Sequence, residues 1–580
     1  MTKIVFRVDA SIRMGSGHVM RCMTLADVLR QAGAEVSFIC RELPGNLCGL
    51  IEAAGFALAR LPQPANAFKP VVNSDIPHAA WLEVDWRVDA EEAGQILARK
   101  YAETDWLIVD HYALDAQWEG AMRRYVKNVM VIDDIADRKH DCDLLLDQNM
   151  YANFGSRYDG LVPLHCRKLL GPDFVLLRKE FCEARGKLQK RDGNARRILV
   201  FFGGADSTGE TEKALRAIEL LGRPDIALDV VVGASNPHKD RIKALCAERP
   251  NAVFHYQTHD IANLILNADL ALGAGGASTW ERMALQLPAL TVSVAGNQNE
   301  ILESAANAGV LVNLGDGSKV GPEMMAGELL NMIQDAGKLS SMAENAFGIV
   351  DGFGAERVSQ AIIPRPLRIS LVSDHDSWIN EHTPLLMQAL QKDGHVVNQT
   401  HTVEEIPSGD LAFFLSLGQL VPARILARNR HNLVVHASAL PAGKGWSPWS
   451  WQILEGKNEI PVTLLEAGVS VDSGDIYRTD VMRFTGLELI DELRQALAAK
   501  TVELCAAFVS DYPEVLSKAK KQQGPSSYYP RRKPQDSKLD IDKSIRSQFN
   551  LLRIADNERY PAFFELDGQI FTLKIQREDI

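Results

Sequence analysis

The opening stretch Ile4-Val5-Phe6-Arg7-Val8-Asp9, followed by Gly15-Ser16-Gly17-His18-Val19-Met20, determines the fold expected of this chain. Residues 4–6 are apolar and favour a β-strand, and residues 19–26 read as the start of a helix. A strand that ends in a glycine-rich turn and leads into a helix is the opening unit of a nucleotide-binding α/β fold. Its glycines let the backbone approach a ligand, and the helix N-terminus offers unpaired N–H groups to an anion. His18 lies at this helix start, either as a catalytic group or as a cap or packing residue.

Length, charge and cysteine spacing limit the class of protein. At 580 residues the chain is too long for one hydrophobic core, and we expect roughly three to four domains. The net charge of −12 argues against broad electrostatic binding to nucleic acid. No apolar run approaches the ~20 residues of a membrane helix, and residues 1–3 lead directly into a strand, so we expect a cytoplasmic protein that does not bind membranes. The eight cysteines form no Cys-x-x-Cys pair, so we expect neither a metal site nor a disulfide framework.

Three further apolar runs in the first part of the chain, at 106–112, 129–134 and 144–151, end in polar residues. Ligands of open α/β sheets gather at the carboxyl ends of the strands. The polar residues that follow the first two runs either form a site or cap the following helices; they are Asp110, His111, Asp133 and Asp134. Residues 62–90 contain prolines and little periodicity, which predicts a loop region.

A second strand–turn–helix unit begins at residue 197, where a strand over 197–202 precedes the glycine turn 203–210. The most informative part of this half is 268–281, a buried strand followed by two glycines, two hydroxyls and a glutamate. Backbone N–H groups of residues 275–277 and the side chains of Ser278 and Thr279 are suited to holding a diphosphate. Glu281 either accepts the ribose hydroxyls or caps the helix.

The residues Arg7 to Ser11 and Gly15 to Cys22 resemble the opening of the UDP-2,4-diacetamido-2,4,6-trideoxy-β-L-altropyranose hydrolases, which are pseudaminic-acid enzymes of the glycosyltransferase-B fold. The resemblance covers roughly the first 360 residues and implies two Rossmann-like halves, a UDP-sugar substrate and no cofactor. It makes His18 the catalytic base, and we expect Asp9, at the end of the same strand, to orient its imidazole. The implied substrate-binding residues are Gly17, Arg21, Gln148, Asn149, Tyr151, Arg178, Gly204, Gly275, Gly276, Ala277, Ser278, Thr279, Glu281, Asn297 and Gln298.

Residues from about 366 to the end resemble the 10-formyltetrahydrofolate-dependent formyltransferases, which implies this folate as formyl donor. His436 and Asp472 match the catalytic histidine and aspartate of that family, but Val434 occupies the position of its asparagine. Valine cannot form the hydrogen bond that helps to hold an oxyanion. Either a nearby donor replaces it (Asn432, Ser438 or Lys444), or the domain is weakly active or serves only in binding or assembly.

The expected architecture is therefore α/β throughout, with two Rossmann-like halves at 1–190 and 191–363, a formyltransferase-like domain at 366–517 and a small β-barrel-like domain at 518–580. The expected function is hydrolysis of a UDP-linked 2,4-diacetamido-2,4,6-trideoxy sugar or its N-formyl analogue, in nonulosonic (pseudaminic) acid biosynthesis. The fused domain would N-formylate the 4-amino sugar. The alternatives are an inverting UDP-sugar glycosyltransferase with a non-catalytic formyltransferase-like domain, a non-catalytic sugar-nucleotide sensor or, for the third domain, a methionyl-tRNA formyltransferase. The oligomeric state stays open.

Overall fold

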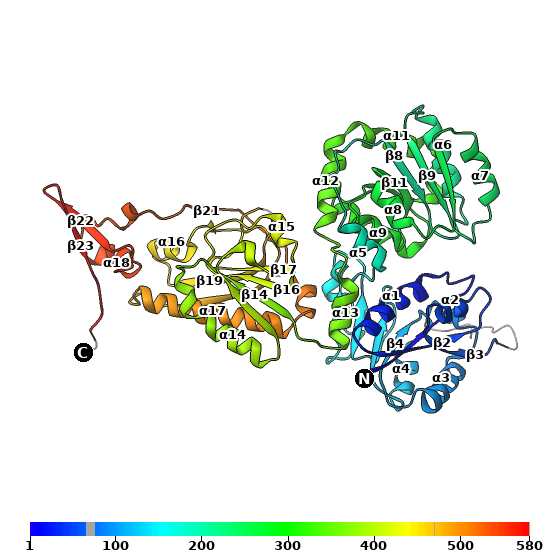
Figure 1. The fold of residues 1–580 in the computed structure, drawn as a ribbon, viewed down its shortest axis with the longest axis horizontal. Coiled ribbons are helices and arrows are strands. Elements are labelled where there is room, and N and C mark those ends of the chain that lie inside the picture. Colours follow the sequence, from blue (N-terminus) through cyan, green and yellow to red (C-terminus); the bar gives the residue numbers. More distant parts are fainter. Residues whose placement is uncertain (65–75, 469, 579–580) are drawn as a thin grey trace. The chain divides into compact units, whose positions relative to one another are not determined.

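The computed structural model describes residues 1–64, 76–468 and 470–578, and the chain divides into two compact units, residues 1–364 and 365–580 (Figure 1). Part of the predicted loop 62–90, residues 65–75, lies outside the described residues. The remainder is not all loop, because it contains the 3₁₀ helix η1 (Ala79–Leu82) and the start of α3 (Trp86–Lys100).

The first sheet consists of seven parallel strands in the order β3-β2-β1-β4-β5-β6-β7. Strand order reverses between β1 and β4, and in such sheets ligands bind beyond the carboxyl ends of the strands at this point. The strands are β1 (Lys3–Val8), β2 (Glu35–Arg41), β3 (Ala57–Leu61), β4 (Thr104–Asp110), β5 (Val126–Ile132), β6 (Leu144–Asp147) and β7 (Arg167–Leu170). Helices α1 (Gly17–Gln31), α2 (Cys48–Ala53), α3 and α4 (Ala116–Met122) connect them.

The second sheet repeats this design with six parallel strands in the order β10-β9-β8-β11-β12-β13. The strands are β8 (Arg197–Phe201), β9 (Ala227–Val232), β10 (Ala252–Tyr256), β11 (Leu270–Ala274), β12 (Ala289–Ser293) and β13 (Val312–Asp316). The helices are α6 (Glu210–Leu220), α7 (Lys239–Ala247), α8 (Ile261–Asn267), α9 (Ser278–Ala284), α10 (Asn299–Asn307), α11 (Pro322–Gln334) and α12 (Ala336–Phe347). Two Rossmann-like halves in one unit form the predicted glycosyltransferase-B architecture.

Two helices link the halves. Helix α5 (Lys179–Arg185), which the prediction grouped with the first half, packs against α8 and α9 of the second. Helix α13 (Gly354–Ile362) packs against α1 and the 3₁₀ helix η3 (Pro172–Phe174) of the first half. The chain therefore returns to the N-terminal half through α13.

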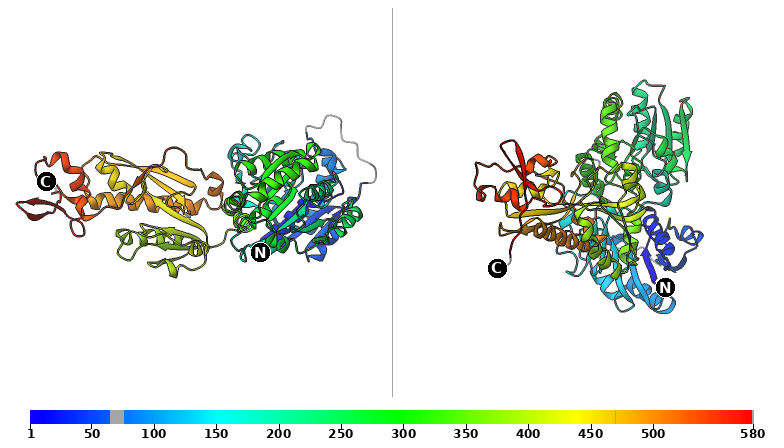
Figure 2. Two further views of the ribbon diagram at one scale, coloured as in Figure 1. Left: turned by 90° about the horizontal axis from the view of Figure 1, so that it is seen from above. Right: turned by 60° about the vertical axis from the view of Figure 1, so that its left-hand side comes forward.

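The unit 365–580 is built on a mixed sheet in the order β15-β14-β16-β17-β19-β20. Strands β15 (Val396–Thr400), β14 (Arg368–Val372), β16 (Gly409–Phe414) and β17 (Asn429–His436) are parallel, whereas β19 (Glu459–Glu466) and β20 (Ile476–Arg483) pair antiparallel. Helix α14 (Thr383–Lys392) lies beside the long α17 (Ile490–Ser510), which runs along the sheet (Figures 1 and 2). Short helices α15 (Ala423–Leu426) and α16 (Pro448–Leu454) complete this part.

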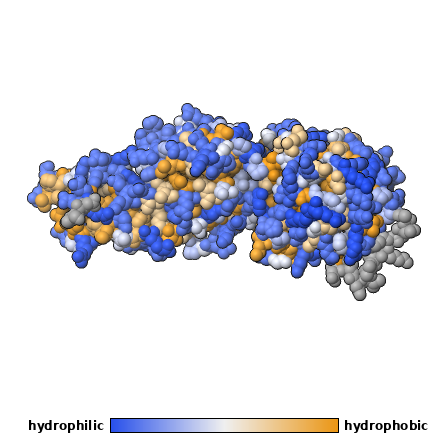
Figure 3. Space-filling view, turned by 90° about the horizontal axis from the view of Figure 1, so that it is seen from below, coloured by the Kyte–Doolittle hydropathy of each residue, from blue (hydrophilic) through white to orange (hydrophobic). Residues whose placement is uncertain are grey.

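The described residues after 517 contribute a strand to the preceding domain and a small C-terminal β-sheet. Strand β21 (Tyr528–Tyr529) pairs with β18 (Lys444–Gly445), so this segment is attached to the preceding domain. Beyond helix α18 (Phe549–Arg553), β22 (Ala562–Leu566) and β23 (Gln569–Leu573) form a two-stranded sheet instead of the predicted barrel, which two strands cannot close. Apolar side chains are scattered among polar ones on the face in Figure 3, as is normal for folded proteins.

Candidate functional sites

The first site is centred on His18, in the first turn of α1 beyond the carboxyl end of β1. Its ring nitrogen Nδ1 lies 2.6 Å from Oδ1 of Asp110, the last residue of β4. The parallel register of β1 and β4, which pairs Val8 with Asp110, brings the two residues together. Because a carboxylate can only accept, Nδ1 donates the hydrogen. No described residue forms a hydrogen bond with the other ring nitrogen, Nε2.

Asp110 is completely buried and held in its ionised form. Burial alone would raise its pKa, but the positive charge of Arg21 and the contact with His18 lower the pKa well below its usual range. Arg21 donates from Nε to Oδ2 at 2.6 Å and from an Nη atom to Oδ1 at 2.7 Å. The carboxylate therefore presents a fixed negative charge to the histidine.

The prediction that Asp9 orients His18 is wrong, because Asp9 is used elsewhere. Its two oxygens accept from the Arg7 guanidinium at 2.6 and 2.9 Å, and Oδ1 also accepts the backbone N–H of Arg41. His111 faces it with Nε2 at 3.5 Å, and burial lowers the pKa of His111 to about 4. Asp9 thus neutralises a buried arginine, and we assign it a structural role.

Asp134 connects the His18–Asp110–Arg21 group to the predicted sugar-binding residues. Its carboxylate accepts from Arg21 at 2.9 Å, from the Tyr112 hydroxyl and from the Asn149 amide at 3.3 Å. The Tyr151 hydroxyl donates to the Asp134 carbonyl at 2.7 Å. These bonds gather Arg21, Asn149 and Tyr151 beside His18.

Gln148 and Asp133, by contrast, stabilise loops. Gln148 accepts the backbone N–H of Leu176 at 3.0 Å. Asp133 accepts the N–H of Ala136 at 2.9 Å and pairs with Arg138. The described residues between β5 and β6 form no helix, so Asp133 stabilises this loop and caps no helix.

Glu281 and Arg178 mark the second half of this site. Arg178 donates to Glu281 Oε1 at 3.1 Å, and Trp280 donates from its indole N–H to the Asn149 amide oxygen at 3.2 Å, so both bonds join the two halves. Burial raises the pKa of Glu281, and the Arg178 charge opposes that rise. No side chain caps the start of α9, which leaves Glu281 without a capping role among the described residues.

The glycine positions around α9 have a steric reason. A Cβ at Gly275 would lie 2.7 Å from the Leu302 side chain, so a larger residue would displace α10. The hydroxyls of Ser278 and Thr279 accept from Arg282, at 3.1 and 3.2 Å. Gln298 accepts the N–H of Val294, whereas Asn297 is exposed.

The turn containing Gly204 differs from the turn before α9. Asp206 accepts the N–H groups of Glu210 and Thr211, at 2.8 and 3.0 Å, so the start of α6 already has an anionic partner. The backbone of Gly204 instead packs closely on Gly233, where an added Cβ would lie 2.3 Å from the Gly204 carbonyl oxygen. The two glycine turns of the second half are therefore not equivalent.

The second site lies at the carboxyl end of β17. His436 is buried, with Nε2 at 2.8 Å from the Gly443 carbonyl oxygen and Nδ1 at 3.6 Å from Asp472 Oδ1. A carbonyl only accepts, so Nε2 carries a hydrogen and Nδ1 is the nitrogen that faces Asp472. The N–H of Gly445 donates to Asp472 Oδ2 at 2.9 Å and fixes the carboxylate.

The three suggested replacements for the missing asparagine differ. Asn432 is excluded, because its amide donates to the Leu426 carbonyl at 2.9 Å. Ser438 is buried and its hydroxyl has no partner in the described part of the chain, which leaves a donor available beside His436. Lys444 is half-buried on β18.

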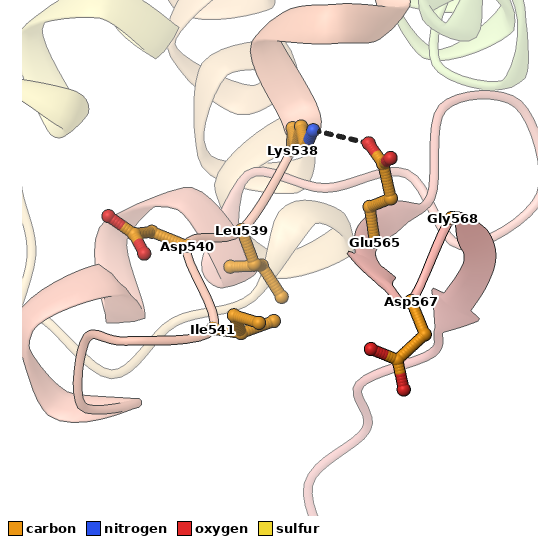
Figure 4. A pocket seen from close by; sticks show the side chains of 7 residues that line it. All are labelled: Lys538, Leu539, Asp540, Ile541, Glu565, Asp567 and Gly568. Carbon is orange, nitrogen blue, oxygen red and sulfur yellow. Dashed lines mark hydrogen bonds and ion pairs between the residues drawn. The ribbon is translucent and has the colours of Figure 1, made fainter.

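A surface pocket elsewhere in this unit lies between residues 538–541 and the turn of the β22–β23 hairpin (Figure 4). Lys538 and Glu565 form an ion pair across it at 2.8 Å. It contains none of the predicted site residues. Among the described residues, no cluster of His, Cys, Asp or Glu could hold a metal ion, and no helix is long and apolar enough to cross a membrane.

Comparison with known proteins finds relatives for both units, although no family model matches. The N-terminal part is similar to the spore coat polysaccharide biosynthesis protein SpsG of Bacillus subtilis, with 30% identity over 193 residues, 33% of this chain and 56% of SpsG. It is also 24% identical over 308 residues to the UDP-2,4-diacetamido-2,4,6-trideoxy-beta-L-altropyranose hydrolase of Campylobacter jejuni, covering 53% of this chain and 97% of that enzyme. The chain thus spans about half the length of SpsG.

Another region is similar to methionyl-tRNA formyltransferases, with 30% identity over 227 residues to that of Geotalea uraniireducens, covering 38% of this chain and 66% of the relative. Among solved structures, Acinetobacter baumannii MurG aligns over 62% of this chain and 99% of its own, with 18% identity and a TM-score of 0.43. The Clostridium thermocellum methionyl-tRNA formyltransferase aligns over 37% of this chain, with 20% identity and a TM-score of 0.31. The chain therefore joins a part similar to sugar-nucleotide enzymes to a part similar to formyltransferases.

Proposed function

We propose that residues 1–364 hydrolyse a UDP-linked 2,4-diacetamido-2,4,6-trideoxy sugar, or its N-formyl analogue, to UDP and the free sugar. The observation that carries the proposal is His18, whose Nδ1 donates to the buried Asp110 carboxylate while Nε2 has no described partner. The similarity to the Campylobacter jejuni hydrolase over 97% of that enzyme supports the substrate class.

In the proposed reaction His18 acts as a general base. Nε2 takes a proton from water, the water oxygen forms a bond to the anomeric carbon, and the bond from that carbon to the UDP oxygen breaks, with inversion. Asp110 stabilises the imidazolium and fixes the tautomer that leaves Nε2 free to accept. UDP leaves as an anion, so the enzyme does not need the second carboxyl group of ordinary glycosidases. Glu281 accepts the ribose hydroxyls.

The test is UDP release from candidate UDP-sugars by the full chain, without any acceptor. We expect release of UDP and free sugar, and a loss of at least ~10²-fold in turnover for His18→Asn with UDP binding retained. Release that requires an acceptor alcohol would identify a glycosyltransferase instead. A loss below tenfold in the variant would remove the general-base role.

We further propose that residues 365–580 transfer a formyl group to the 4-amino group of a UDP-4-amino-4,6-dideoxy sugar. The side chains present fit a formyl-transfer site, since the buried Ser438 hydroxyl, close in sequence to His436, has no hydrogen-bond partner within the described ranges. Bound 10-formyltetrahydrofolate would supply an activated formyl group. His436 would hold a proton at Nδ1, Asp472 would stabilise the protonated ring, and Ser438 would supply the donor that Val434 lacks.

Formyl transfer is tested by supplying the folate and the UDP-amino sugar and measuring the mass of the sugar product. We expect a product heavier by one formyl group from the native chain and none from His436→Asn. Hydrolase turnover of the same preparation serves as the folding control. No formylated product from a preparation that releases UDP would leave this unit a binding or assembly domain.

A further inference from the structure

Three aromatic rings, those of Tyr112, His78 and Trp81, form a cluster with the His18 ring. Tyr112 packs edge-on against His18, with ring centroids 4.6 Å apart. The rings of His78 and Trp81 also pack on Tyr112, with centroids 5.4 and 5.7 Å from its centroid, and their own centroids lie 4.7 Å apart. Neither His78 nor Trp81 belongs to the residues that the two sequence resemblances associate with a function. Both come from the segment that the sequence predicted to be loop.

Trp81 differs from its neighbours in sequence, which pack in the hydrophobic core of the first half. Leu82, in the same 3₁₀ helix, is 1% exposed and belongs to the hydrophobic core of the first half, and Trp86 also packs against that core. Trp81 is absent from the described members of this core and stays half-buried against Tyr112. Leu82 therefore lies in the core, whereas Trp81 of the same 3₁₀ helix packs on Tyr112, which in turn contacts His18.

His78 also has a polar atom without a structural partner. It precedes η1 but does not cap it, and its Nδ1 is enclosed with no hydrogen-bond partner among the described residues. Enclosed polar atoms are nearly always paired, so an unpaired one beside a reacting centre needs an explanation. Burial lowers the pKa of His78, which keeps the ring neutral and compatible with the nearby His18 and Arg138.

We propose that Trp81 and His78 form the wall that contacts the sugar of the UDP-sugar and selects N-acylated deoxy sugars over fully hydroxylated ones. The inference rests on the proposed function and adds the residues that determine its specificity. Trp81 presents an apolar ring to the methyl groups of the 6-deoxy carbon and of the N-acyl substituents. The neutral His78 ring supplies a hydrogen-bonding edge for an amide. A hydroxyl placed against Trp81 would lose its water without gaining a partner.

An apolar surface discriminates between sugars only to a limited extent, and this sets the change in kcat/KM that we expect. An apolar pocket rejects an isostere that adds a hydroxyl by only ~10²-fold. We therefore expect Trp81→Ala to lower kcat/KM for the UDP-diacetamido-trideoxy sugar by roughly 10- to 100-fold and to change it little for the fully hydroxylated UDP-glucose. Trp81→Phe keeps a ring and should stay within a few-fold of the native chain.

The experiment measures kcat/KM for both UDP-sugars and the Kd of UDP for the native chain, Trp81→Ala, Trp81→Phe, His78→Ala and Trp86→Ala. Trp86 is the matched control, because it is a half-buried tryptophan five positions away that packs on the core. We expect Trp86→Ala to preserve the ratio of the two kcat/KM values, and every variant to retain the Kd of UDP. An unchanged ratio in Trp81→Ala, or an equal loss in Trp86→Ala, overturns the proposal.

The design also separates this inference from the hydrolase proposal. If the native chain releases no UDP, the affinity of the UDP-diacetamido-trideoxy sugar relative to UDP is measured instead. Loss of that extra affinity in Trp81→Ala alone would support the sugar wall while the hydrolase proposal fails. Equal relative affinity in the native chain and Trp81→Ala would overturn the wall.

Discussion

Replacement of Asp110 by asparagine should reduce UDP release strongly while changing the shape of the site very little. Asp110 Oδ1 accepts from His18 Nδ1 at 2.6 Å and from Arg21 at 2.7 Å, and Oδ2 accepts from Arg21 Nε at 2.6 Å. An asparagine has one acceptor oxygen and one NH₂ group. In either orientation its NH₂ group therefore faces a donor of Arg21.

Each orientation also impairs the base. With NH₂ toward His18, Nδ1 must become the acceptor, the hydrogen moves to Nε2, and the ring cannot take a proton from water. With the amide oxygen toward His18, the tautomer survives, but the imidazolium loses the negative charge that stabilises it. General-base catalysis is worth ~10²–10⁴-fold, so we expect a loss of about 3–5 kcal/mol of transition-state stabilisation.

Asp9→Asn provides the matched control. Asp9 is an equally buried carboxylate paired with an arginine, and it has no bond to His18 among the described residues. Removal of one partner from such a buried pair costs about 3–5 kcal/mol of stability, so both variants should unfold at lower urea concentration. Only Asp110→Asn should lose turnover in excess of its loss of folded protein.

The assay follows UDP release over pH at saturating substrate, with the folded fraction measured on the same samples. Equal turnover per folded molecule in the two variants would show that Asp110 is merely structural. So would a loss below about tenfold in Asp110→Asn, because a base without its tautomer and counter-charge cannot retain that activity.

Two further outcomes are expected. Glu281→Ala should weaken UDP binding by roughly 10- to 100-fold, because hydrogen bonds to a charged group contribute about 1.5–3 kcal/mol. It should also raise KM more than it lowers kcat. If calorimetry finds an unchanged Kd for UDP, the Arg178–Glu281 pair is only a contact between the two halves. The N-terminal unit should also lose stability in acid. Burial alone would raise the pKa of Asp89, but the charges of Arg7 and Arg41 lower this pKa to about 2. The ionised carboxylate therefore stabilises the fold fully above the unfolded pKa near ~4, and this stabilisation disappears as pH falls toward about 2. Urea midpoints that fall as steeply below pH ~4 in Asp89→Asn as in the native chain would contradict this assignment.

The sequence was sufficient for the architecture and for the position of His18, the proposed base. Apolar strands followed by glycine turns predict parallel sheets with their ligand edge at the strand ends, and His18, Asp110 and Asp134 do lie at that edge. It was insufficient for the pairing of charges across strands. Asp110 is 92 positions from His18, and only the register of β1 against β4 brings them together.

The misassigned Asp9 shows which signal could have been used. Arg7 and Asp9 are two positions apart, and alternate residues of a strand point to the same face, so an arginine inside a buried strand indicates the use of that carboxylate. A buried guanidinium must be paired with an acceptor, so a carboxylate next to it is better explained as its partner than as a catalytic group. The sequence also contained little periodicity over 76–84, where a single 3₁₀ turn places Trp81 against Tyr112.

Alternate residues also share a face in strand β17 of the second unit, and this limits which side chain can replace the missing asparagine. Residues 432, 434 and 436 share one face of β17, so Val434 lies beside His436 in line with Asn432. Two residues of a strand span about 6–7 Å, and Asn432 is a further step from the carboxyl edge, with its amide already bonded to Leu426. A replacement donor must therefore come from beyond the strand end. Ser438 satisfies this condition, since it follows His436 by two positions and its buried hydroxyl is unpaired among the described residues. The loss of an asparagine inside the strand is thus compatible with formyl transfer only through the loop that follows it.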